Sequence, residues 1–224
     1  MSVDRPSFLR DERGSAYLEF TVTVSVFFLM LFGIVEFSYL FYQWNTATKA
    51  TQLGARLAAV SNPVSSDLTN WTGLDLTGTS CSGLLPGDPI PPACNFDREC
   101  TSNSSTGATG SCTNGTYDAA AMQTIVFGRK RQSSDADTCS VADTDKGMCD
   151  IYDKIGPQNV IIRYEYTGLG YAGRPGGPVP TITVRLTGIT FNFVALDALA
   201  GLGPVAIPGL TTSITGEDLR ASGS

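Results

Sequence analysis

A long apolar run lies near the amino end of the chain. Between Phe20 and Val35 there is no charged residue. A helix needs about 20 mostly apolar residues to cross the hydrocarbon core of a bilayer, and in hydrocarbon its backbone hydrogen bonds override the weak helix propensity of Val and Thr. The far end of the run carries aromatic residues of the kind that gather at a membrane interface, Tyr39, Tyr42 and Trp44. The pattern predicts one membrane-spanning helix that starts near Tyr17.

The helical pattern continues beyond this span. Small or apolar residues recur every three or four positions, at Ala47, Ala50, Leu53, Gly54 and Leu57, and this spacing marks one face of a helix. The helix is expected to end before Pro63. A small-residue face allows close packing on a sheet or on a neighbouring helix, and we expect it to pack within its own domain.

The segment from Ser61 to Tyr117 is dense in turn residues and predicts loops with short extended pieces. From Asp118 to Arg131 the pattern predicts a short helix, and its expected inward-facing residues are Ala121, Met122, Ile125 and Val126. The segment Ala195 to Gly209 is apolar but too short and broken to span a bilayer. It is expected to form either an extended tail packed on a sheet or a surface contact.

The clearest strands lie late in the chain. Apolar and polar residues alternate from Val160 to Thr167 and again from Thr181 to Thr187, which is typical of strands with one buried face. The parity changes at Gly188, where a bulge would return the following apolar residues to the same side. The two strands predict an antiparallel hairpin packed on the helix, and hence an α+β domain.

All six cysteines follow the apolar run: Cys81, Cys94, Cys100, Cys112, Cys139 and Cys149. An even number on one side of a membrane segment indicates an oxidising compartment and up to three disulfides, with fifteen possible pairings. The chain has no histidine and no C-x-x-C spacing, so structural zinc is not expected.

Asp143, Asp145 and Gly147 resemble the start of a calcium loop, but the twelfth position lacks Glu. A solvated acidic loop is the main interpretation, and calcium is the alternative.

Basic residues indicate the orientation of the span. Three arginines precede it, whereas only Lys49 and Arg56 follow closely, so the amino end is expected in the cytoplasm. A cleavable secretory signal has a shorter apolar stretch followed closely by small residues, and Gln43 and Trp44 do not fit that pattern. The net charge of −6 argues against nucleic acid as a partner.

No enzymatic activity or cofactor is expected, because the chain has no histidine and no nucleophile-elbow or phosphate-loop motif.

The start of the apolar run carries a specific arrangement of residues. Arg13 and Gly14 precede Ser15, and a carboxylate and an aromatic residue follow at Glu19 and Phe20. This arrangement resembles the cleavage motif of prepilins from the tight-adherence (Flp) pilus system. The resemblance implies a cut between Gly14 and Ser15 by a prepilin peptidase. Glu19 is then expected to pair with a released amino terminus, since a charge near the bilayer edge is costly unless paired.

A second set of residues lies deeper in the span and beyond it. The segment Gly33-Ile34-Val35-Glu36-Phe37, followed by Gly54-Ala55-Arg56, resembles the TadE-like family of minor pseudopilins in the same pilus system. The resemblance covers about residues 13 to 60. It implies a non-catalytic subunit or assembly factor of a pilus machine, with the membrane, the prepilin peptidase and other pilins or pseudopilins as partners. Gly33 and Glu36 are its expected membrane-helix packing residues.

The resemblance and the pattern together predict four regions: a leader (1–14), a TadE-like transmembrane helix with its extension (15–60), a cysteine-rich loop region with a short helix (61–157), and a β-hairpin region with a tail (158–224). The expected fold is α+β, in which a single transmembrane helix continues into a small pilin-like ectodomain with an antiparallel sheet and disulfide-stapled loops. The expected location is the bacterial inner membrane, with the carboxyl-terminal domain in the periplasm. The alternative is an unprocessed, membrane-anchored ectodomain with a binding role outside the pilus system.

Overall fold

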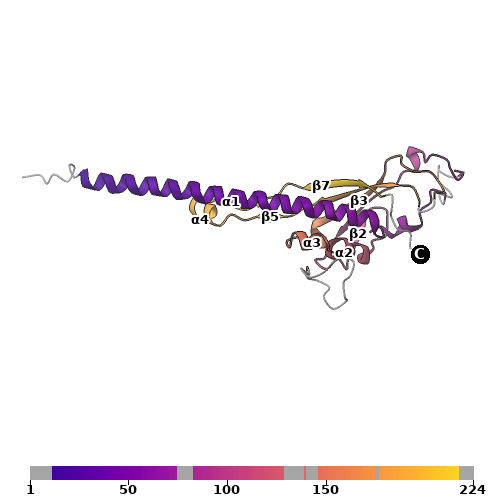
Figure 1. Ribbon diagram of the computed structural model, residues 1–224. Coiled ribbons are helices and arrows are strands. Elements are labelled where there is room, and N and C mark those ends of the chain that lie inside the picture. Colours follow the sequence, from indigo (N-terminus) through magenta and orange to yellow (C-terminus); the bar gives the residue numbers. More distant parts are fainter. Residues whose placement is uncertain (1–11, 75–82, 129–138, 140–145, 175–176, 217–224) are drawn as a thin grey trace, which may run out of the picture. The chain divides into compact units, whose positions relative to one another are not determined.

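The computed structural model describes residues 12–74, 83–128, 139, 146–174 and 177–216 (Figure 1). Its longest element is helix α1 (Glu12–Val60), which has 49 residues and a length of about 70 Å at 1.5 Å per residue. The part from Ser15 onward is long and apolar enough to cross a membrane. Because the hydrocarbon core is only about 30 Å thick, α1 must continue well beyond any bilayer that it spans.

The chain divides into two compact units, and α1 contributes to both. The first unit consists of α1 up to Tyr42 and the segment Phe191–Val205. That segment contains the short helix α4 (Ala195–Ala200). The second unit contains Gln43–Thr190 and the residues from Ala206 onward.

The second unit is built around a five-stranded antiparallel sheet in the order β2-β1-β3-β4-β7. Its strands are β1 (Asp97–Ser102), β2 (Gly110–Cys112), β3 (Val160–Tyr166), β4 (Pro180–Leu186) and β7 (Leu210–Thr215). In the central pair, Ile162 lies opposite Val184. Burial alternates strictly along β3, so the predicted antiparallel pair and the α+β class are confirmed.

The predicted bulge at Gly188 is wrong. Strand β4 ends at Leu186, and the Thr187 N–H donates to the Asn159 carbonyl at 2.8 Å. Gly188 has a φ of +72°, a conformation that glycine adopts without strain. The chain therefore leaves the sheet at Gly188, and β5 (Thr190–Phe191) pairs with β6 (Val205–Ala206) in a separate two-stranded sheet.

Several of the observed strands and helices lie outside the predicted elements. The region expected to form loops with short extended pieces contains β1 and β2, and β1 is an interior strand of the sheet. Strand β7 was not predicted, because Leu210–Thr215 is mostly Thr and Ser. Of the two alternatives for Ala195–Gly209, the extended tail is wrong for the first part of the segment, which forms α4.

The predicted helix after Asp118 is confirmed but shorter. Helix α2 (Ala119–Phe127) buries the four residues named above, and the Asp118 side chain accepts from the Ala121 N–H at 3.1 Å as its N-cap. The helix ends before Gly128, which has a φ of +100°. The remaining short elements are α3 (Met148–Ile151) and three single-turn 3₁₀ helices, η2 (Ser66–Asn70), η3 (Pro92–Cys94) and η4 (Pro157–Asn159).

The second half of α1 runs along the sheet of the second unit (Figure 1). Its small-residue face is buried, at Ala47, Ala50, Gly54, Ala55 and Ala58. Packing is close there, because a Cβ atom added at Gly54 would overlap the side chain of buried Met148. The prediction that this face packs within its own domain is confirmed.

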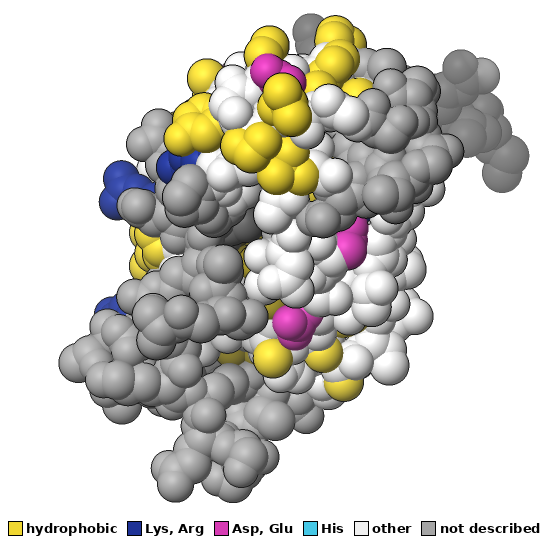
Figure 2. Space-filling model, turned by 90° about the vertical axis from the view of Figure 1, so that its right-hand side faces the viewer, with side chains coloured by type: hydrophobic (Ala, Val, Ile, Leu, Met, Phe, Trp, Pro, Cys, Tyr) yellow, Lys and Arg dark blue, Asp and Glu magenta, His cyan; other side chains and the backbone are white. Residues whose placement is uncertain are grey.

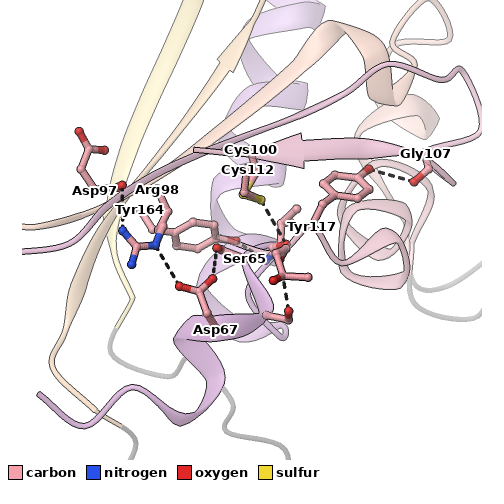
Figure 3. The surroundings of a disulfide bond; sticks show 12 residues. Ser65, Asp67, Asp97, Arg98, Cys100, Gly107, Cys112, Tyr117 and Tyr164 are labelled. Carbon is pink, nitrogen blue, oxygen red and sulfur yellow. Dashed lines mark hydrogen bonds and ion pairs between the residues drawn. A yellow bond between two sulfur atoms is a disulfide. The ribbon is translucent and has the colours of Figure 1, made fainter. Parts of the chain in front are cut away.

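Disulfides connect parts of the second unit. Cys100 and Cys112 lie opposite each other on β1 and β2 and are bonded (Figure 3). Cys139 is bonded to Cys149, and Cys94 is also disulfide-bonded. Cys81, Asp143 and Asp145 lie outside the described residues, so the calcium hypothesis stays a prediction.

A polar cluster lies beside the first of these disulfides (Figure 3). Buried Tyr164 accepts a hydrogen bond from the Val64 N–H at 3.0 Å through its hydroxyl oxygen, and burial raises the pKa of Tyr164. Asp67 accepts from the Ser65 hydroxyl and, at 2.9 Å, from Arg98 Nε. Partial burial opposes the ionisation of Asp67, but these two hydrogen bonds outweigh it and lower the pKa of Asp67.

The exposed face of the sheet carries charged residues of both signs. Arg163 forms ion pairs with Asp97 at 2.7 Å and Glu165 at 3.4 Å. Figure 2 shows another face of the molecule, on which the described Lys and Arg side chains lie along the left side, hydrophobic side chains gather mainly at the top, and the acidic side chains are scattered.

Candidate functional site

The candidate site lies in the first unit, where the segment Phe191–Val205, here called the arm, docks on the apolar half of α1. The arm has 15 residues, and Asp197 is its only charged one. Its helix α4 begins after Val194, whose side chain has no polar atom to cap the helix. The first N–H groups of any helix lack intrahelical partners, so α4 needs acceptors from elsewhere in the protein.

Glu36 of α1 supplies these acceptors. Its Oε1 accepts from the N–H groups of Val194 at 2.8 Å and Ala195 at 2.6 Å, and its Oε2 accepts from the N–H of Leu196 at 3.1 Å. Hydrogen bonds to an ionised acceptor are about twice as strong as neutral ones. A single side chain therefore caps a helix that lies about 160 residues away in the sequence.

Aromatic contacts extend the docking toward the interface end of α1. Phe193 contacts Phe37 with ring centroids 5.5 Å apart, and Phe191 contacts Tyr39 at 5.8 Å. Phe191 and Phe193 also contact each other at 5.0 Å. All three pairs are edge-to-face, the arrangement that aromatic quadrupoles favour. These rings hold the start of the arm against α1 at Phe37 and Tyr39.

An open apolar groove of about 540 Å³ lies between α1 and the arm. It is lined by Leu29, Met30, Gly33, Ile34 and Phe37 of α1 and by Leu196, Ala200 and Leu202 of the arm. Gly33 faces the arm, and a Cβ added there would lie 4.0 Å from Leu196 Cδ2, an ordinary van der Waals distance. Gly33 and Glu36, the two residues predicted for helix packing, thus meet at one site, and their partner there is the arm.

The predicted processing residues form a separate group. Gly14, Ser15, Glu19 and Phe20 all lie in the first turns of α1, and the last three are exposed. Ser15 and Glu19 are four residues apart and therefore share one face of the helix. Glu19 and Glu36 are separated by 17 residues, about 25 Å along the helix axis, so the structure does not bring the two predicted sets together.

Sequence reasoning missed the partners of Glu36. They are backbone N–H groups, which no residue type reveals, and they come from a segment that was expected to be extended. Two signals were available. Glu36 lacks a basic partner anywhere in the span, and Val194-Ala195-Leu196 offers no side-chain cap for a helix that starts there.

Residues 14–56 match the model of the protein family described as TadE-like protein. The chain carries a TadE-like segment. This segment lies wholly within α1 and includes the processing residues, Gly33, Glu36 and the start of the buried small-residue face. No curated protein and no solved structure matches the chain.

Proposed function

We propose that the protein is a minor pseudopilin or pilus-assembly protein of the Tad (Flp) system, anchored in the bacterial inner membrane by the first half of α1. The observation that carries the proposal is the position of the TadE-like segment. It begins at the exposed apolar end of α1 and ends where the same helix is buried in a disulfide-bonded domain. One helix thus contributes both an exposed apolar surface and a buried face of a folded domain.

The proposed topology places the amino end in the cytoplasm and the domain in the periplasm. The basic residues before the span favour this orientation, and the disulfides require an oxidising compartment. We keep the predicted division into a leader (1–14), a transmembrane helix and its extension (15–60), a cysteine-rich region (61–157) and a sheet region (158–224). The proposed role is non-catalytic and does not involve nucleic acid.

In the proposed mechanism, a prepilin peptidase cuts between Gly14 and Ser15. The new α-amino group would lie one helical turn from Glu19, on the same face of α1. In an assembly, the amino terminus of a neighbouring pilin or pseudopilin can take the same place and set the register between subunits. A carboxylate at the bilayer edge favours such pairing, because it is costly when it has no partner.

Intact-mass and amino-terminal analysis of the membrane-extracted protein tests this function. The expected form starts at Ser15 in a host with the prepilin peptidase and keeps the leader in a host without it. A Gly14→Leu variant should keep the leader in both hosts, whereas the control variant Val22→Leu, at an exposed position of the span outside the motif, should be cut normally. A leader retained on the unaltered protein in the competent host would contradict the pseudopilin role and favour an unprocessed, membrane-anchored ectodomain.

A further inference from the structure

Large apolar side chains of the arm remain exposed although the arm docks on α1. The exposed fractions are 78% for Val194, 58% for Leu199 and 44% for Leu202. Contiguous exposed apolar surface in water marks a site of interaction with another protein or with a membrane. The arm keeps this exposed apolar surface although its backbone is hydrogen-bonded to Glu36 of α1. We therefore expect the partner that covers this surface to be apolar.

The position of the arm along α1 indicates what that partner is. The arm contacts α1 from Leu29 to Tyr39, which lies within the run that would span the bilayer. Leu29 lies about 20 Å and Phe37 about 8 Å along the helix from Tyr42, the aromatic residue at the interface end. Half of a bilayer core is about 15 Å thick, so a span that ends at Tyr42 places most of the arm at the depth of the outer leaflet and the groove beside Leu29 just past the midplane.

Backbone N–H groups at the two ends of α4 have partners within the protein, as this environment requires. Hydrocarbon offers no partner to an exposed N–H or C=O group, so each must be satisfied within the protein. At the start of α4, Glu36 accepts from three N–H groups. At its end, the Gly201 N–H donates to the Asp197 carbonyl at 2.8 Å, and the Leu202 N–H donates to the Leu196 carbonyl at 3.4 Å. Glu36 benefits in turn, because a carboxylate at this depth is costly unless it is hydrogen-bonded.

We propose that the arm is a second membrane-embedded element of this protein. It enters the outer leaflet from the periplasmic side, docks on the span through Glu36, and turns Val194, Leu199 and Leu202 toward lipid acyl chains, which also fill the groove beside Gly33. This inference rests on the proposed anchoring of α1. It adds a lipid-binding role for a segment outside the TadE-like match.

Quenching of tryptophan fluorescence by lipids with brominated acyl chains tests the inference on the full chain in vesicles. Three variants each add one tryptophan to the native Trp44 and Trp71: Leu199→Trp in the arm, Phe28→Trp in the span, and Leu85→Trp on the exposed surface of the other unit. The fluorescence added by Leu199→Trp should be lost about as strongly as that added by Phe28→Trp. The fluorescence added by Leu85→Trp should persist.

The outcomes separate the inference from the function on which it rests. If Phe28→Trp is quenched while Leu199→Trp behaves like Leu85→Trp, α1 is anchored and the embedded arm is overturned. If Phe28→Trp is not quenched either, the anchoring itself fails. Lipids brominated near the headgroup then report the depth of the added tryptophan. When Glu36→Ala is combined with Leu199→Trp, the added tryptophan should move toward the headgroups. Glu36→Gln keeps a hydrogen-bond acceptor and should therefore cause a smaller shift. An unchanged depth in Glu36→Ala would overturn the docking role of Glu36.

Discussion

The two halves of α1 are one continuous helix, yet they use opposite kinds of side chain. In the first half, large apolar residues such as Phe27 and Met30 are 59% and 65% exposed. In the second half, Ala47, Ala50 and Ala58 are fully buried. A lipid-facing helix gains from apolar area, whereas a helix packed on its own domain gains from close approach. Helix formation is therefore common to both halves, and side-chain size decides which surroundings each half requires.

In both halves of α1, a polar side chain is hydrogen-bonded to a segment that is distant in the sequence. Glu36 accepts from backbone N–H groups of the arm, and buried Gln43 accepts from the Tyr152 hydroxyl at 3.0 Å and from Lys154 Nζ at 3.2 Å. Each is a polar side chain on an apolar or small-residue face, and each is satisfied by a segment distant in the sequence. Buried polar groups without such partners cost about 1–3 kcal/mol. The two positions therefore fix which segments lie against α1.

Replacing both cysteines of the Cys100–Cys112 disulfide by Ala gives the largest expected difference between the halves. The bond closes a loop with a sequence separation of 12, and a loop of about that length contributes about 3 kcal/mol. Denaturant unfolding in detergent, followed by the near-UV signal of the domain, should show this loss. Hydrogen exchange of the amides in the first half of α1 should be unchanged, because hydrogen bonds within the helix satisfy that backbone.

The matched control for the disulfide variant is Leu85→Ala, a change at a 68% exposed side chain, which should alter neither measurement. If the amides of the first half lose protection together with the domain, the two halves are one cooperative unit, and the contrast drawn between them fails.

The two glycines of α1 sharpen the comparison through packing. Gly54→Leu should lower the free energy of unfolding by about 2 kcal/mol, within the usual range of about 1–3 kcal/mol for overpacking a core, because its side chain overlaps Met148. Gly33→Ala should leave the stability unchanged within about 0.5 kcal/mol, the usual limit for a substitution that disturbs no packing, since 4.0 Å separates its added Cβ from Leu196. Thermal unfolding of both variants in detergent measures the difference.

A compensating change tests the cause. Adding Met148→Ala to Gly54→Leu should restore part of the lost stability by making room for the leucine. If the double variant is less stable than both single variants, the loss at Gly54 does not come from overlap with Met148.

The sequence predicts the parts of this fold that follow from local periodicity. The apolar run, the small-residue face ending in Leu57, and the alternation along Val160–Thr167 each specify an element and its buried side. They do so because period and polarity are properties of neighbouring residues. The family resemblance, carried by motifs from Gly14 to Arg56, is confirmed by the family match.

The parts that escaped prediction depend on distant partners. Strand β7 is mostly Thr and Ser, and it becomes a strand because β4 offers an unpaired edge. Strand β1 lies within a turn-rich region but pairs along β3. Helix α4 is too short to be stable alone and depends on Glu36. In each case the decisive interaction is a backbone hydrogen bond to a segment that the local pattern does not identify.

The hydroxyl of Tyr164 gives the next smaller effect, within the buried half. Tyr164→Phe leaves the Val64 N–H without its acceptor in a fully buried place, and we expect a loss of about 1.5 kcal/mol. Tyr117→Phe is the matched control, since its hydroxyl donates to the Gly107 carbonyl at 2.9 Å in a partly buried place. It should cost less than Tyr164→Phe in the same denaturant titration, and equal losses would show that burial does not set the cost.

The smallest expected effect concerns pH. Partial burial raises the pKa of Asp67, but hydrogen bonds from Ser65 and Arg98 lower the same pKa by a larger amount. The pKa of Asp67 in the folded state therefore lies below the ordinary value. The resulting stability is fully present above the unfolded pKa of about 3.9 and is lost as the pH falls through the folded pKa. Asp67→Asn should therefore cost about 0.5–1 kcal/mol at neutral pH, and the gap to the unaltered protein should narrow below about pH 4. A gap that stays constant down to pH 2 would mean that the ionisation of Asp67 does not contribute, and that the cluster in Figure 3 stabilises the domain through neutral hydrogen bonds alone.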